Sequence, residues 1–262
     1  MKKFLSLLVA LILALQFPVI SAWAEEAPAD TLGISAPSAI LMEASTGTVV
    51  LEKNSHEQLP PASVTKVMTL LLIFDAISQG KIHLDDTVTT SEYASSMGGS
   101  QVFLEAGETQ SVDTMIKCIS VASANDASVA MAEYVAGTES LFVEMMNEKA
   151  QEIGCKDTHF VNANGLHDEN HYTTAHDLAM IAQEAYKNEE FRKIVGSRYY
   201  TIPATNKTAE ERVLANHHAL LGEGDWHYDG CLGGKTGYTD TALNTLVTYF
   251  EKDGTVYICV VL

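Results

Sequence analysis

Ser63 and Lys66 are the first residues whose types and spacing could do chemistry. They lie three positions apart at the start of an apolar run, and residues at that spacing on a helix are side-chain neighbours. A serine hydroxyl is a weak nucleophile that needs an adjacent base. Lysine can be that base only when neutral, and burial with nearby positive charge lowers its pKa in that direction. By itself the pair is weak evidence, since a capping serine before an exposed lysine has the same spacing.

A second short motif, Ser123-Ala124-Asn125, adds a hydroxyl and an amide. A serine hydroxyl can relay a proton between a base and a leaving group. An asparagine amide can bind a substrate carbonyl and can also contact a lysine. Alone, the tripeptide is equally typical of a helix cap or a turn.

A third motif, Lys235-Thr236-Gly237, follows two further glycines. Glycine on a strand edge lets a substrate backbone approach closely. Lysine and threonine beside it can receive a carboxylate. The competing interpretation is a glycine-rich turn with a solvated lysine.

Hydrophobic patterning predicts the elements that must position these motifs. The short apolar runs Ala39–Met42 and Thr48–Leu51 surround a turn and predict a hairpin. Val64–Ile77 is apolar on every face, which predicts a buried helix that ends at Gly80. The middle of the chain is helical over Ser111–Ala136 with an interruption near Ser123, over Glu139–Ile153 and over Thr174–Lys187.

Two β-rich runs, Thr245–Phe250 and Thr255–Leu262, end the sequence, and the Asp253-Gly254 pair between them is a hairpin signal. Strands at both ends can pair into one antiparallel sheet with the helices packed against it. The expected fold class is therefore α+β.

The N-terminus has the pattern of a secretory signal peptide over residues 1–24: a basic head, a short apolar run and Ala22-Trp23-Ala24 as the exit. We expect a flexible leader over residues 25–37 and one catalytic domain over residues 38–262. Because Leu262 ends inside a strand-like run, we expect this domain to be incomplete at its C-terminus.

The net charge of −18 argues against nucleic acid as a partner and fits an exported protein. The four cysteines, Cys118, Cys155, Cys231 and Cys259, match no zinc or redox spacing and predict buried, inert thiols, although disulfides stay open.

Together the three motifs resemble the signature of penicillin-binding proteins and class A β-lactamases. The middle motif keeps the serine and asparagine, and all three stand in the expected order. From about Leu32 to Leu262 the chain resembles the D-alanyl-D-alanine carboxypeptidases, the low-molecular-mass penicillin-binding proteins. Shared segments are Glu43–Gly47, Pro60–Ser63, Gly98–Ser100 and Lys235–Asp240.

This resemblance implies a role for each matching residue. Ser63 would attack the bond between two D-alanines of a peptidoglycan pentapeptide, Lys66 would take its proton, and Ser123 would pass a proton to the leaving group. The acyl-side amide would bind Asn125, and the terminal carboxylate would bind Lys235 and Thr236 beside Gly237. The backbone N–H groups of Ser63 and Tyr238 would form the oxyanion hole. β-Lactams would acylate Ser63. No metal or organic cofactor is implied.

The chain departs from the family pattern in two places. Leu243 stands where the family usually has glycine, which puts the local backbone in doubt. The family also continues beyond the position of Leu262, usually into a small β domain and a membrane-binding tail. Any membrane association would therefore depend on a C-terminal tail that is missing from this chain.

Three other functions compete. A class A β-lactamase would need a Glu-x-x-Leu-Asn loop pattern, and none occurs in the sequence. His167, His171 and His176 could belong to a metal hydrolase, but they lack a His-Glu-x-x-His helix and loop histidines explain them better. A non-catalytic wall-binding protein could share the fold. Transpeptidase and endopeptidase activities use the same residues as the carboxypeptidase and stay open.

Overall fold

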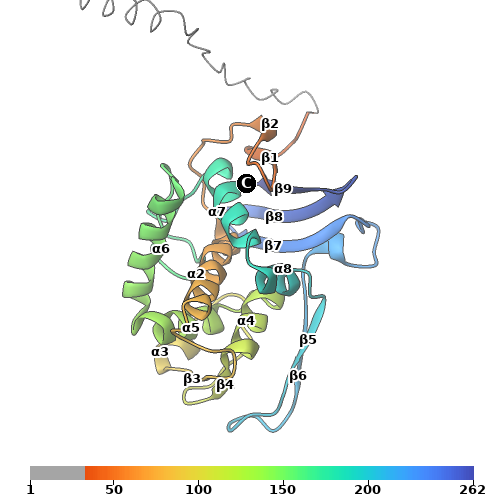
Figure 1. The fold of residues 1–262 in the computed structure, drawn as a ribbon. Helices are drawn as coiled ribbons and strands as arrows, with labels where there is room; N and C mark the ends of the chain where they lie inside the picture. Colours follow the sequence, from red (N-terminus) through yellow and green to blue (C-terminus); the bar gives the residue numbers. More distant parts are fainter. Residues whose placement is uncertain (1–32) are drawn as a thin grey trace, which may run out of the picture.

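The computed structural model describes residues 33–262, so the predicted signal peptide and most of the predicted leader lie outside the described residues. Five strands form one antiparallel sheet at the top of Figure 1, in the order β2-β1-β9-β8-β7. They are β1 (Ala39–Glu43), β2 (Val49–Lys53), β7 (Cys231–Thr239), β8 (Leu243–Lys252) and β9 (Thr255–Val261). The N-terminal hairpin thus pairs with the C-terminal strands through β1 and β9. The predicted α+β class and sheet composition are confirmed.

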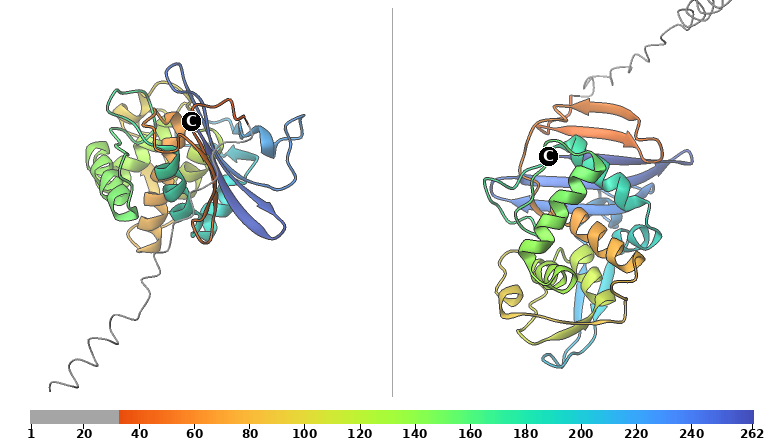
Figure 2. Two further views of the ribbon diagram at one scale, coloured as in Figure 1. Left: turned by 90° about the horizontal axis from the view of Figure 1, so that it is seen from above. Right: turned by 60° about the vertical axis from the view of Figure 1, so that its left-hand side comes forward.

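Helices cover one face of this sheet and extend away from it (Figures 1 and 2). α7 packs against β1 and β9, α8 packs against β7, and α2 contacts both α7 and α8. The α-helices are α2 (Lys66–Ser78), α3 (Glu92–Ser95), α4 (Val112–Val121), α5 (Asn125–Ala136), α6 (Glu139–Ile153), α7 (Ala175–Tyr186) and α8 (Glu189–Val195). Short 3₁₀ turns are η1 (Ala62–Thr65) and η2 (Ala219–Leu221).

Two small two-stranded sheets lie away from the main sheet, at the bottom of Figure 1. β3 (Thr87–Thr89) pairs with β4 (Thr109–Ser111), and the hairpin strands β5 (Tyr199–Ile202) and β6 (Arg212–Ala215) pair with each other. Neither small sheet was predicted from the sequence, nor were α3 and α8.

α2 is the buried central helix that its uniform apolarity predicts. Every residue from Lys66 to Phe74 is buried. The helix begins at Lys66 rather than at Val64, because Ala62–Thr65 form the 3₁₀ turn η1. Ser63 therefore lies in the tight turn in front of α2.

The predicted interruption of the middle helical stretch is a complete break. α4 ends at Val121, α5 begins at Asn125, and Ser123 between them has a φ of 59°. Left-handed backbone is unfavourable for a residue with a side chain, by about 1–2 kcal/mol. The break turns the chain so that Ser123 and Asn125 face the same region as Lys66.

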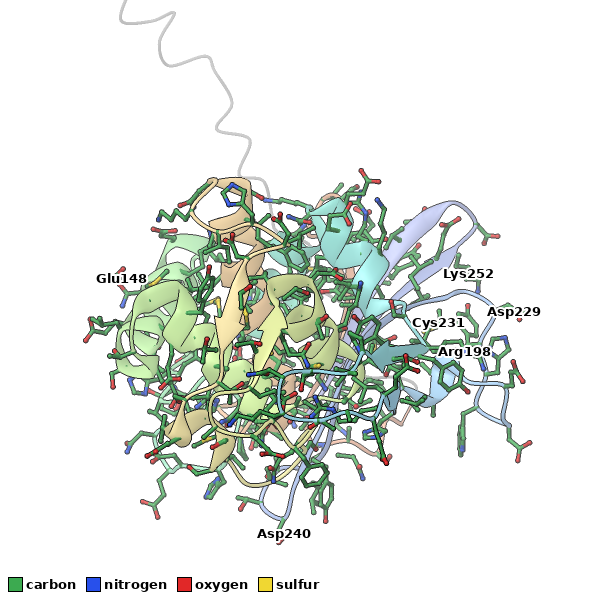
Figure 3. The ribbon with its side chains drawn as sticks, turned by 90° about the horizontal axis from the view of Figure 1, so that it is seen from below. Glu148, Arg198, Asp229, Cys231, Asp240 and Lys252 are labelled. Carbon is green, nitrogen blue, oxygen red and sulfur yellow. The ribbon has the colours of Figure 1, made fainter. Side chains whose placement is uncertain are left out.

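β7 carries the third motif in its interior and precedes the two β-rich runs that were predicted at the end of the sequence. The strand begins at Cys231 and pairs with β8 up to Thr239, opposite Leu243. Figure 3 shows Cys231 and Asp240 near the two ends of this strand, with Lys252 at the far end of β8. The turn between β8 and β9 has positive φ at Asp253 and at Gly254, as a two-residue hairpin requires.

Leu243, the position where the resemblance implies glycine, has a φ of 56° and a side chain that is 61% exposed. Glycine adopts this left-handed conformation without steric strain, while leucine does not. With so much of its surface in water, the side chain offsets little of that strain by packing.

We predict that Leu243→Gly raises the free energy of unfolding by about 0.5 kcal/mol, because relief of strain exceeds the extra entropy that glycine loses on folding. Leu243→Val should lower it, since a β-branched residue tolerates positive φ least. Urea unfolding of the three proteins measures the differences. A destabilised Leu243→Gly protein would show that this turn is not strained.

Candidate active site

Lys66 is completely buried and lies directly beside Ser63. Its Nζ donates to the Ser63 Oγ at 3.0 Å. Two further acceptors surround the amine: the Asn125 Oδ1 at 2.7 Å and the main-chain carbonyl of Asn164 at 2.6 Å. The amine is therefore held in one position against the serine hydroxyl.

The electrostatic environment favours the neutral form of Lys66. Burial is the largest influence and lowers its pKa well below the ordinary lysine value, and the positive charge of Lys235 lowers it further. The negative charge of Asp126 acts in the opposite direction. A neutral amine keeps two N–H donors, for Asn125 and the Asn164 carbonyl, and its lone pair can then accept the proton of Ser63. The predicted spacing places the two side chains side by side.

The turn that carries Ser63 is held in a strained shape. Ala62, immediately before it, has a φ of 52°. The Thr245 Oγ1 donates to the Pro61 carbonyl at 2.8 Å, and Thr65 bonds His171 at 2.8 Å. Left-handed residues that persist under such support are concentrated at functional sites.

β7 runs past Ser63 at very close range. A Cβ on Gly237 would lie 2.9 Å from the Ser63 main-chain nitrogen and would collide with the Thr245 Oγ1. Glycine is therefore required at this point, as the strand-edge argument predicted. The next residue, Tyr238, has a side chain that is 59% exposed at the rim.

Lys235 lies on the same strand but is only 3% exposed. Burial lowers the pKa of its ammonium to about 7. Its Nζ donates to the Thr236 carbonyl at 2.7 Å. A lysine with this pKa changes charge within the physiological range, so the positive charge beside the cleft depends on pH.

The cleft between these elements has a volume of about 300 Å³. Its lining residues are Ser63, Ser100, Ser123, His217, Thr236, Gly237, Tyr238 and Asn244. Ser123 is buried there, and its Oγ has no hydrogen-bond partner within residues 33–262. That hydroxyl is free to bond a ligand or to relay a proton.

The predicted site residues converge, because Ser63, Ser123, Thr236, Gly237 and Tyr238 line one cleft. Asn125 and Lys235 are not among its lining residues; Asn125 bonds Lys66 beneath the cleft. Sequence reasoning missed the Asn164 carbonyl, His217 and Asn244. A main-chain acceptor such as the Asn164 carbonyl has no residue signature. Asn244 could have been identified only by its position on β8, where it pairs with Tyr238 of β7.

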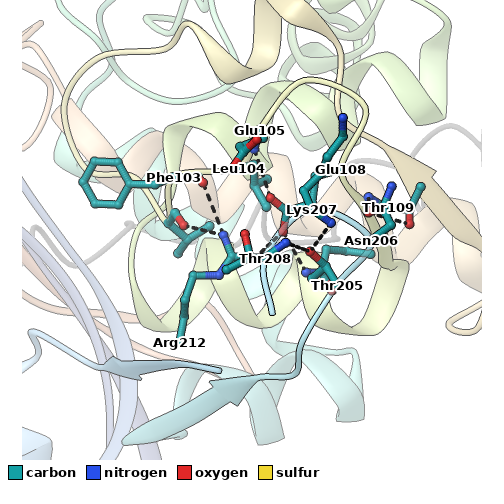
Figure 4. Close-up of polar contacts among 12 residues, drawn as sticks. Phe103, Leu104, Glu105, Glu108, Thr109, Thr205, Asn206, Lys207, Thr208 and Arg212 are labelled. Carbon is teal, nitrogen blue, oxygen red and sulfur yellow. Dashed lines mark hydrogen bonds and ion pairs between the residues drawn. The ribbon is translucent and has the colours of Figure 1, made fainter. Parts of the chain in front are cut away.

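The loop beside the cleft, Gly98–Glu108, is fixed from two sides. The Asp126 carboxylate accepts from the main-chain nitrogens of Val102 and Leu104, at 3.0 Å in the case of Leu104. From β6, Arg212 donates to the Val102 and Phe103 carbonyls and pairs with Glu108 (Figure 4). The hairpin β5–β6 therefore helps to fix the position of the loop that contains Ser100, one of the residues that line the cleft.

Two of the histidines considered for a metal site, His171 and His176, have other partners. His171 accepts from the Val161 main-chain nitrogen at its Nδ1, so its Nε2–H donates to Thr65. Burial lowers the pKa of His171 to about 4. The His176 ring lies 4.5 Å from that of His56. Within residues 33–262, no three His, Cys, Asp or Glu side chains gather as a metal-binding group.

All four cysteines are free thiols. Cys118 and Cys155 are buried as expected, whereas Cys231 and Cys259 are half-buried. Burial raises the pKa of Cys155 to about 12 and that of Cys259 to about 11. These two thiols are therefore poor nucleophiles at neutral pH.

Residues 23–262 match the sequence profile of the D-alanyl-D-alanine carboxypeptidase family, peptidase S11. The chain belongs to this family. It is 46% identical to the D-alanyl-D-alanine carboxypeptidase DacF of Bacillus subtilis over 254 residues, which are 96% of this chain and 64% of DacF. It is 36% identical to DacA of Haemophilus influenzae, with 82% and 53% covered. The chain thus spans a little over half to two thirds of the length of these relatives.

Solved structures agree with the family assignment. The peptidoglycan synthesis regulatory factor PBP3 of Streptococcus pneumoniae superimposes with a TM-score of 0.80 at 30% identity, covering 87% of this chain and 67% of that one. A mutant of the Streptomyces K15 DD-transpeptidase gives 0.79 at 29% identity, with 87% and 90% covered. The expected penicillin-binding fold is thereby confirmed.

We predict a bell-shaped pH dependence for acylation by a penicillin. The rate should rise as Lys66 loses its proton, because only the neutral amine accepts the proton of Ser63. It should fall as the pH passes about 7, because Lys235 then loses the charge that binds the carboxylate. Stopped-flow acylation rates at a series of pH values measure both limbs.

The substitution Asp126→Asn tests whether deprotonation of Lys66 causes the rise of the acylation rate with pH. The charge of Asp126 raises the pKa of Lys66, so its removal should move that limb to lower pH. A rate that keeps increasing up to the ordinary lysine pKa of 10.5 would contradict this assignment of the two lysines.

Proposed function

We propose that this chain is a serine D,D-carboxypeptidase that removes the terminal D-alanine from peptidoglycan stem peptides. The observation that carries the proposal is the buried Lys66 amine, 3.0 Å from the Ser63 hydroxyl in a cleft that also presents Ser123 and Thr236. Family membership supports the reaction class.

In the proposed first step, the Ser63 Oγ attacks the carbonyl carbon of the D-Ala–D-Ala bond and its proton passes to the Lys66 Nζ. The resulting oxyanion accepts hydrogen bonds from the main-chain N–H groups of Ser63 and Tyr238. Loss of one such donor typically lowers the rate by about 10²–10³-fold. The absence of a side chain on Gly237 supports this geometry, since it lets the main chain of β7 lie close to the turn that carries Ser63.

In the second step the C–N bond breaks and the leaving amine of D-alanine takes a proton from Lys66 through the Ser123 hydroxyl. The free Oγ of Ser123 supports this relay. The acyl group is then an ester of Ser63, and attack by water releases the shortened peptide and restores the serine. A β-lactam would acylate the same serine when its ring opens, and the resulting ester would hydrolyse slowly.

Binding in this proposal depends on groups from two elements, α5 and β7. Asn125 would hold the acyl-side amide, and Lys235 with Thr236 would hold the terminal carboxylate. We propose that the enzyme is exported by its N-terminal segment and acts on the cell wall outside the cytoplasm. Within residues 33–262 no helix has the length and apolarity needed to cross a membrane.

Release of D-alanine from a peptide that ends in D-Ala-D-Ala tests the proposal. Ser63→Ala should abolish release. Thr236→Val should raise KM about tenfold or more, because it removes a hydrogen bond to a charged group worth about 1.5–3 kcal/mol. Thr241→Val, at an exposed threonine just beyond the end of β7, is the matched control and should leave KM unchanged.

A transpeptidase is the second candidate, because a structural neighbour has that name. Adding an amino acceptor to the same assay separates the two, since a transpeptidase forms a new peptide bond while it releases D-alanine. Unchanged release by Ser63→Ala would contradict the Ser63 mechanism of both activities, and no release by the folded, unsubstituted protein would favour a wall-binding role.

A further inference from the structure

His171 is a buried histidine that takes no part in the proposed reaction steps. The residue is only 2% exposed, and both of its ring nitrogens have partners. Its Nδ1 accepts from the Val161 main-chain nitrogen at 3.1 Å, so Nε2 carries the proton and donates to the Thr65 Oγ1 at 2.8 Å. The ring also packs edge-on against Phe160, with 5.6 Å between the ring centroids. These contacts determine the orientation of the imidazole.

One partner of the ring belongs to the turn that carries the nucleophile. Thr65 lies in η1, two residues after Ser63 and directly before Lys66. Both Thr65 and Lys66 are completely buried. The bond to His171 therefore acts on the segment that sets the position of the Ser63 hydroxyl against the Lys66 amine.

The other partner, Val161, begins the loop of residues 161–165, which holds the Lys66 amine. Within this loop the Asn164 carbonyl accepts from the Lys66 Nζ at 2.6 Å. The loop lies directly against η1, because a Cβ on Gly165 would be 1.9 Å from a carbonyl oxygen of that turn. The position of the amine therefore depends on how this loop lies against the turn.

The main chain around His171 makes the same connection. Thr173 and Leu59 exchange two hydrogen bonds, of 2.8 and 3.0 Å, shortly before η1. Tyr172 and His159 exchange another two, of 2.9 and 3.0 Å, shortly before the loop. The histidine thus belongs to a segment that is bonded to both parts, and its side chain extends the connection into the protein interior.

We propose that His171 is a positioning residue for the Ser63–Lys66 pair, because its ring joins the loop of residues 161–165 to the turn η1 and so holds the amine against the nucleophile. This inference rests on the proposed function. It adds a residue from outside the three motifs to the site, and it assigns a role to one of the histidines that were considered for a metal site.

Two substitutions of His171 separate positioning from packing. His171→Phe fills the space of the ring without either hydrogen bond, whereas His171→Gln keeps one donor and one acceptor. At saturating benzylpenicillin, His171→Phe should slow the acylation step about 10–100-fold, because small misplacements of reacting groups are costly. The dissociation constant of the noncovalent complex should stay unchanged, and His171→Gln should restore most of the rate. His167→Phe, at an exposed histidine four residues earlier, is the matched control and should react like the unsubstituted protein.

Thr65→Val is an independent test, because it removes the hydroxyl and leaves the imidazole in place. It should also slow acylation, and adding it to His171→Phe should cause little further loss, since both remove the same bond. Full acylation rates in His171→Phe or in Thr65→Val, or effects of the two substitutions that multiply, would overturn the proposal. If His171→Phe fails to fold, the rate of Thr65→Val still decides.

Nitrogen-15 NMR of the histidine rings tests the connection without any activity and keeps the inference separate from the proposed function. One ring signal, identified by its absence in His171→Gln, should show a proton on Nε2 that is protected from exchange with solvent. Thr65→Val should lose this protection. A proton on Nδ1, or equally fast exchange in both proteins, would contradict the proposal. Absence of acylation in the unsubstituted protein, together with the expected spectrum, would support the connection and contradict the proposed function.

Discussion

The burial of one amine, that of Lys66, is the constraint on which the rest of the site depends. A lysine inside a protein is unfavourable when charged, so the apolar surroundings of α2 favour the neutral form that can serve as a base. Three oxygen atoms nevertheless hold it in place: those of Ser63, Asn125 and the Asn164 carbonyl. These atoms come from separate parts of the chain, so the three hydrogen bonds of the amine form only when the helical region is correctly folded.

The five-stranded sheet supplies the second half of the site through β7. This strand brings a second buried lysine, Lys235, close enough for its charge to lower the pKa of Lys66. Burial lowers the pKa of both lysines, and the charge of Lys235 favours the neutral form of Lys66. Strained backbone at Ala62 and Ser123 lies on the helical side of the same cleft. The surrounding hydrogen bonds maintain both strained residues, which is how active sites are commonly held ready for reaction.

Sequence patterns were sufficient for the parts of the site that depend on side-chain identity. Ser63 and Lys66 were placed together by helical spacing, and Asn125 was added by the resemblance to a known family. The Asn164 carbonyl could not be found in this way, since a main-chain acceptor has no residue signature. The hairpin β5–β6 was missed for a related reason: its strands are four residues each with one buried residue apiece, and the contacts of Arg212 and Asn206 with a distant part of the chain hold it in place.

The central claim is that Ser63 is a nucleophile activated by a buried neutral lysine. Intact-protein and peptide mass spectrometry after incubation with benzylpenicillin test it most directly, with Lys66→Met beside the unsubstituted protein. The account predicts one added penicilloyl group on the peptide that contains Ser63, and little or none in Lys66→Met at equal folded content. An adduct on any other residue, or equally fast labelling of Lys66→Met, would contradict it.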